Sequence, residues 1–95
     1  MPVYIIVEVS IHDEKIYEEY KKLTPASIEA FHGRFIIRGG QTTALEGNWK
    51  PERIVVVEFP TIELANTWYN SEIYAPAKEL RQRAASTRMI LANGI

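Results

Sequence analysis

The chain has 95 residues, of which 46% are hydrophobic, and its formal net charge is −1. This length suits one domain with a modest core, and the apolar and aromatic content excludes intrinsic disorder. The mixed, nearly neutral charge excludes an extended polyanion-binding surface, and the absence of cysteine excludes disulfides, thiolate catalysis and cysteine-based metal sites.

The first predicted strand is Val3 to Val9, a short run that is rich in β-branched residues. Apart from Glu8 it is apolar at both alternating positions, which is typical of a central strand covered on both faces. A helix is expected next, over residues 14–33. Asp13 can cap its start, and apolar residues recur in it at helical spacing.

Two residues in this predicted helix indicate an interruption and an end. Pro25 predicts a kink or a second helical piece, and Gly33 predicts a left-handed end for the helix. A long second strand is expected from Arg34 to about Leu45, with the pair Gly39-Gly40 inside it. We expect these glycines to bend or bulge the strand, so that one part pairs with the next strand and the other serves a dimer sheet.

After a turn over residues 46–52, a third strand is predicted from Arg53 to Phe59, apolar on both faces except at Glu58. Thr61 can cap a helix over residues 62–70.

Ser71 can cap a further helix over residues 72–85. Pro76 lies in or near the first turns of this helix, where a proline does little damage. The last predicted strand is Thr87 to Asn93. The order β-α-β-β-α-β predicts an α+β, ferredoxin-like fold with a four-stranded antiparallel sheet as a single domain over residues 1–95. Right-handed crossovers would place the first and third strands in the centre.

With both helices on one face, the opposite face of the sheet would still be apolar. The economical way to cover it is a second copy packed sheet to sheet, so we expect a homodimer.

Four motifs, Arg-Gly-Gly, Glu-Gly-x-Trp, Glu-Phe-Pro and Trp-Tyr-x-Ser-x-x-Tyr, occur in this order from Arg38 to Tyr74. With them, the chain resembles a bacterial family of domains of unknown function in the dimeric α/β-barrel superfamily, over nearly its whole length. The resemblance implies a ferredoxin-like protomer that dimerises through its sheet, but no settled activity. Relatives in the wider superfamily include cofactor-free monooxygenases, haem-degrading enzymes, an isomerase and stress-response proteins.

Arg38 and Glu58 are the candidate catalytic residues. Folding the hairpin brings Arg38 near Glu58, and a carboxylate among apolar neighbours needs a partner. The pair could line a pocket in which Glu58 acts as a general base and Arg38 stabilises an enolate or phenolate. The alternative is a structural ion pair that braces a bend.

Trp68, Tyr69 and Tyr74, together with Arg38, are the candidate substrate-binding residues. They could form the walls of a pocket for a flat apolar ligand; the alternative is core packing. His12 and His32 lack metal-binding spacing, and no phosphate-loop motif is present, so we expect no metal and no cofactor.

Three functions therefore stay open: binding of a small aromatic or carbonyl metabolite, a cofactor-independent monooxygenase or isomerase reaction, and a structural or stress-associated dimer without chemistry. Whether the protein is an enzyme is not decided by the sequence. We see no signal-peptide pattern and no run of about 20 apolar residues, so we expect a cytoplasmic protein without a membrane partner.

Overall fold

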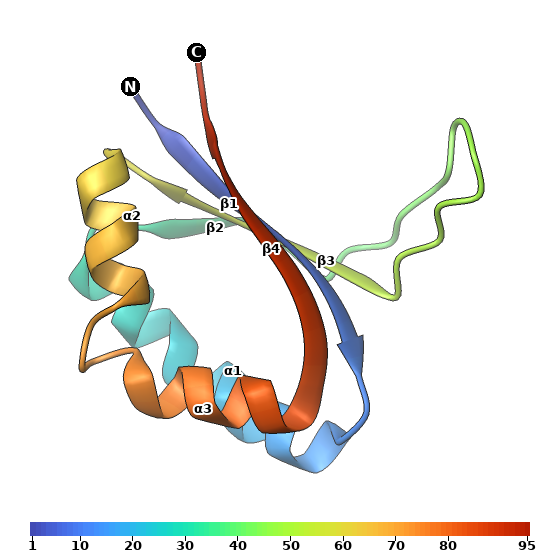
Figure 1. Cartoon of the computed structure of the whole chain (residues 1–95), viewed down its shortest axis with the longest axis horizontal. Coiled ribbons are helices and arrows are strands. Elements are labelled where there is room, and N and C mark those ends of the chain that lie inside the picture. The colour runs from blue at the N-terminus through green and yellow to red at the C-terminus, as the bar shows by residue number, and fades with distance from the viewer.

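The computed structural model describes residues 1–95, which form a four-stranded antiparallel sheet with three helices on one face (Figure 1). In chain order the elements are β1 (Val3–Ile11), α1 (Glu14–Ala30), β2 (Arg34–Arg38), β3 (Arg53–Phe59), α2 (Ile62–Tyr69), α3 (Ala75–Ala84) and β4 (Ala85–Asn93). The strand order is β2-β3-β1-β4, so the two strands that are apolar on both faces lie in the centre. The predicted α+β, ferredoxin-like fold is confirmed, with two helices in its second crossover.

The alternation of β1 divides the sheet into two faces. Val3, Ile5, Val7 and Val9 are buried, whereas the residues between them are only partly buried. In the antiparallel ladders Val7 lies opposite Val55 of β3 and opposite Met89 of β4. We call the side that these residues share the helix face and the opposite side the open face.

Helix α1 is continuous from Glu14 to Ala30, so Pro25 does not begin a second helical piece. The side chain of Asp13 accepts a hydrogen bond from the Ile16 amide at 3.1 Å and caps the helix, as predicted. Pro25 lies inside the helix and has no amide hydrogen to donate to the carbonyl of Lys21, four residues earlier. The carbonyl of Lys21 instead accepts a hydrogen bond from the side chain of Arg38.

The end of α1 is a Schellman motif, in which the amide of Gly33 donates to the carbonyl of Ile28 at 2.9 Å. The left-handed residue of this motif is His32, with φ of +64°, and not Gly33 as predicted. Gly33 meets a different requirement, since a Cβ at this position would lie 2.6 Å from the ring of Phe59.

Strand β2 is shorter than predicted and ends at Arg38. Its irregularity also lies elsewhere, because the register with β3 shifts between Phe35 and Ile37. One extra residue, Ile36, is therefore accommodated within the strand, before the glycines. Gly39 then turns the chain out of the sheet with φ of +73°, while its amide still donates to the carbonyl of Ile54 at 2.8 Å.

Residues 40–52 form an exposed arm that extends away from the sheet (Figure 1). The predicted continuation of the second strand to Leu45 is wrong, because no neighbouring strand of the chain pairs with this segment. The arm is tied to the open face by Trp49, whose indole nitrogen donates to a Glu8 oxygen at 3.2 Å.

Helix α3 begins at Ala75, three residues later than predicted. Ser71 caps the preceding turn, where its hydroxyl oxygen accepts a hydrogen bond from the Tyr74 amide at 3.1 Å. None of the three helices has both the length and the apolar character needed to cross a membrane.

The role of Gly39 can be tested with Gly39→Ala. The substitution forces a side chain into the left-handed region and into the space filled by the Arg53 guanidinium. We expect a loss of about 1–3 kcal/mol in the free energy of unfolding, measured by urea denaturation. Gly40→Ala is the matched control, because open space surrounds that position. An equal loss in both variants would contradict the account.

Candidate functional site

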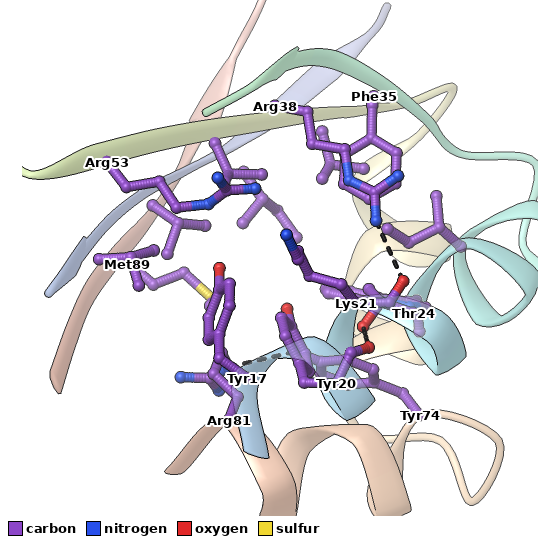
Figure 2. A pocket seen from close by; sticks show the side chains of 17 residues that line it. Tyr17, Tyr20, Lys21, Thr24, Phe35, Arg38, Arg53, Tyr74, Arg81 and Met89 are labelled. Atoms are coloured by element: carbon purple, nitrogen blue, oxygen red, sulfur yellow. Dashed lines mark hydrogen bonds between the residues drawn. The ribbon is translucent and has the colours of Figure 1, made fainter. Parts of the chain in front are cut away.

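A small cavity lies between the helix face of the sheet and the helices (Figure 2). Its volume is about 20 Å³, which holds about one water molecule. Most of its wall is aliphatic or aromatic. The lining residues are Ile5, Val7, Val9, Tyr17, Tyr20, Lys21, Thr24, Ile28, Phe35, Arg38, Arg53, Val55, Val57, Trp68, Tyr74, Arg81 and Met89.

The floor of the cavity is a chain of polar groups from Tyr20 of α1, Tyr74 just before α3 and Arg81 of α3. Nε of Arg81 donates to the hydroxyl of Tyr74 at 3.3 Å, and that hydroxyl lies 3.5 Å from the hydroxyl of Tyr20. Arg81 also donates to the Thr87 hydroxyl at 2.6 Å. Because Arg81 is only a donor, the Tyr74 hydroxyl accepts from it, and in the contact between the two tyrosine hydroxyls either oxygen can be the donor.

Burial, and after it the neighbouring Tyr74, raises the pKa of Tyr20 far above its ordinary value. Tyr20 is therefore protonated at every physiological pH. The Tyr20 hydroxyl therefore keeps a proton that it can donate in a hydrogen bond, and it does not act as a phenolate base.

Trp68 and Tyr74 stack on each other in the core, with ring centroids 4.1 Å apart. The Trp68 indole nitrogen donates to the buried hydroxyl of Ser27 at 3.1 Å, which fixes the ring against α1. Both rings line the cavity. Tyr69 does not, because it faces Met89 and Ile90 of β4 in a separate shallow hollow.

Arg38 lies on the helix face, where it lines the cavity and stacks over the ring of Phe35 at 4.4 Å. Its Nη2 donates to the carbonyl of Lys21 at 3.0 Å (Figure 2). This is the carbonyl that Pro25 leaves without a helical partner. A side chain of β2 thus supplies the hydrogen bond that the proline removes from α1.

Glu58 lies on the open face, and the predicted pair with Arg38 is wrong. Its carboxylate accepts from Nε of Arg34 at 2.7 Å and from the hydroxyl of Tyr4 at 2.9 Å. The register shift at Ile36 is the cause. It places Arg34 opposite Glu58, and it turns Arg38, four residues later, to the other face.

The open face carries a second ion pair. Glu8 accepts hydrogen bonds from the Arg88 guanidinium on β4, one of them from Nε at 2.9 Å. Arg88 and then Trp49 lower the pKa of Glu8, as Arg34 and then Tyr4 lower the pKa of Glu58. Both carboxylates are therefore fully ionised at neutral pH and are poor general bases.

Sequence reasoning assigned no ligand-binding role to Tyr17, Tyr20 or Arg53, all of which line the cavity. One signal for Arg53 was present, because it shares its alternation with Val55 and Val57, which face the helices. Sequence analysis gave Arg81 no role either, and its Nε donates to the Tyr74 hydroxyl. His12 and His32 belong to no group of metal-ligating side chains.

The partner of Glu58 can be identified by titration. Arg34→Gln should raise the Glu58 pKa toward its ordinary value, whereas Arg38→Gln should leave it unchanged, as measured by NMR of the carboxyl carbon. Because the folded-state pKa is lowered, the interaction stabilises the fold above the ordinary carboxyl pKa, and this contribution disappears as the pH falls through the lowered value. A shift caused by Arg38→Gln alone would contradict the assignment.

Comparisons with known proteins identify the family. The chain belongs to the family described as a domain of unknown function (DUF1330), which matches residues 2–95. No curated protein matches the chain.

Two solved structures share the fold. One is the protein of unknown function RPA0582 from Rhodopseudomonas palustris, with a TM-score of 0.81 and 18% identity over 99% of this chain and 82% of that chain. The other is SnoaB, a cofactor-independent oxygenase from Streptomyces nogalater, with a TM-score of 0.68 and 13% identity over 99% of this chain and 93% of that chain.

Proposed function

We propose that the protein binds a small aromatic or carbonyl metabolite in the cavity between the sheet and the helices. The observation that carries this proposal is the lining of the cavity. Apolar and aromatic walls surround a few convergent polar groups, among them the Tyr20 hydroxyl and the Arg53 guanidinium. This composition is typical of small-molecule sites.

A metabolite enters only if the cavity opens, because the present volume of about 20 Å³ is far below the roughly 300–1,000 Å³ of ligand pockets. The side chains able to move are the long ones, namely Lys21, Arg38, Arg53 and Met89 (Figure 2). Ordering each in a new position costs about 0.5–1.5 kcal/mol, so we expect modest affinity.

A cofactor-independent monooxygenase or isomerase is the second candidate. It is supported by the shared fold with SnoaB, a cofactor-independent oxygenase, and by the Arg81–Tyr74–Tyr20 chain, which could stabilise a developing oxyanion. The lining residues contain no carboxylate or histidine that could take a proton from a substrate. Binding without chemistry is therefore the better-supported function.

We test binding with a thermal-shift screen of aromatic and carbonyl metabolites. Val55→Phe fills the cavity from β3 and should abolish the shifts seen with the wild type. Ile62→Phe, at an exposed site on α2, is the control and should retain them. Hits that survive Val55→Phe would place binding elsewhere and contradict the proposal. Oxygen uptake with the hits then tests the second candidate.

We also propose that the open face is the interface of a homodimer. It exposes Ile37 and Ile90, which are 42% and 63% accessible in the single chain. The Glu8–Arg88 and Glu58–Arg34 pairs on the same face cancel in charge. Two copies of this face can therefore approach each other without net repulsion. A structural or stress-associated dimer would use the same surface.

Light scattering at micromolar concentration should give the mass of two 10.9-kDa chains. Ile90→Glu introduces a carboxylate onto the open face of the edge strand β4 and should yield monomers. Ile73→Glu, at an exposed site between α2 and α3, should leave the dimer intact. A monomeric wild type would contradict the proposal.

A further inference from the structure

We infer that the ligand of the cavity is an anion: a flat, apolar molecule that carries one carboxylate or other oxyanion. The inference rests on the proposed function and adds the chemical class of the ligand. Its basis is the charge of the lining, to which Arg38, Arg53 and Arg81 all belong, and none of them forms an ion pair with a carboxylate.

Arg53 is the clearest of the three. Its Nε is buried and has no hydrogen-bond partner in the protein. The guanidinium lies 5.5 Å from the ring centroid of Tyr17, and the Tyr17 hydroxyl points toward the sheet on the same side of the cavity (Figure 2). A buried donor without an acceptor is unfavourable by itself. An oxyanion between Arg53 and Tyr17 would satisfy it.

Arg81 adds a second, deeper charge. The residue is only 4% exposed, and the acceptors of its guanidinium are the neutral hydroxyls of Tyr74 and Thr87. Buried charges are ordinarily paired with an opposite charge. The Tyr74 hydroxyl, which accepts from Arg81, lies 3.5 Å from the hydroxyl of the cavity residue Tyr20.

No carboxylate near the cavity forms an ion pair with these arginines. Lys21 is paired with Glu18 at 2.9 Å. This hydrogen bond first, and the charges of Lys21, Lys22 and Arg53 after it, lower the pKa of Glu18. Glu18 does not line the cavity, and its side chain is 58% exposed. The lining therefore keeps three arginines without an ion-pair partner, of which Arg53 interacts with Glu18 only at longer range.

The other residues of the cavity wall favour a ligand with a planar, apolar portion. Phe35, Val55, Trp68 and Met89 give apolar and aromatic surfaces from the sheet and from α2. A planar hydrocarbon portion can lie against them while its charged end faces Arg53. A highly hydrated anion such as inorganic phosphate would leave these surfaces unmatched.

The inference is tested by isothermal titration with 2-naphthoate and with 2-naphthamide, which have the same shape and differ in charge. The wild type should bind the acid at least tenfold more tightly than the amide. Arg53→Met keeps the length of the side chain and removes the charge, so the preference should fall to less than threefold. Arg83→Gln removes an exposed charge elsewhere on α3 and should leave the preference unchanged.

The outcomes separate the two proposals. Equal binding of acid and amide, lost in Val55→Phe, would overturn the anion inference and leave the cavity as a ligand site. Binding of neither probe by a folded wild type would overturn both. A preference that survives Arg53→Met in a variant with an unchanged circular dichroism melt would also overturn the role given to Arg53. Tyr17→Phe gives a second measurement, with an expected loss of several-fold for the acid alone.

Discussion

The burial of one alternating set of residues on β1 and β3 beneath the helices is the constraint on which the rest of this structure depends. Val7 of β1 and Val57 of β3 belong to that set, and the side chains beside them in sequence must point to the other face. Glu8 and Glu58 are thereby placed on the open face, where each finds an arginine. The cavity is formed only by what the helix face presents.

A single extra residue in β2 then distributes the arginines. Arg34, before the extra residue Ile36, points to the open face, where it pairs with Glu58. Arg38, after Ile36, points to the helix face. Arg38 therefore reaches the carbonyl that Pro25 leaves free in α1. The bulge at Ile36 thus allows Arg34 to form an ion pair with Glu58 on the open face. On the helix face it allows Arg38 to donate to the free carbonyl of α1 and to add a positive charge to the cavity lining.

Much of the fold could be predicted because its signals are local or periodic. The order of the elements indicated the sheet, and the two strands that are apolar on both faces indicated which strands are central. Asp13 and Thr61 cap their helices as expected. The length of the second strand was wrong, because pairing depends on a neighbour that residues 40–52 do not have. The second helical piece expected at Pro25 was wrong, since α1 is one continuous helix and Arg38 donates to the carbonyl that Pro25 leaves free.

The candidate site was predictable only in part, for the same physical reasons. Arg38, Trp68 and Tyr74 do line one cavity, whereas Glu58 is on the opposite face and Tyr69 lies beside β4. A shift of one residue in register exchanges the faces of a strand, and sequence alone did not locate that shift. That Tyr17 and Arg53 line the cavity could not be predicted, because it depends on how α1 crosses the sheet.

The central claim is that the helix-face cavity is a binding site whose arginines recognise an anion. NMR chemical-shift mapping during titration with 2-naphthoate tests it most directly. The account predicts that the largest shifts fall on cavity residues such as Tyr17, Arg53 and Val55. Shifts that cluster on the open face around Tyr4 and Ile90, or no shifts at all, would contradict it.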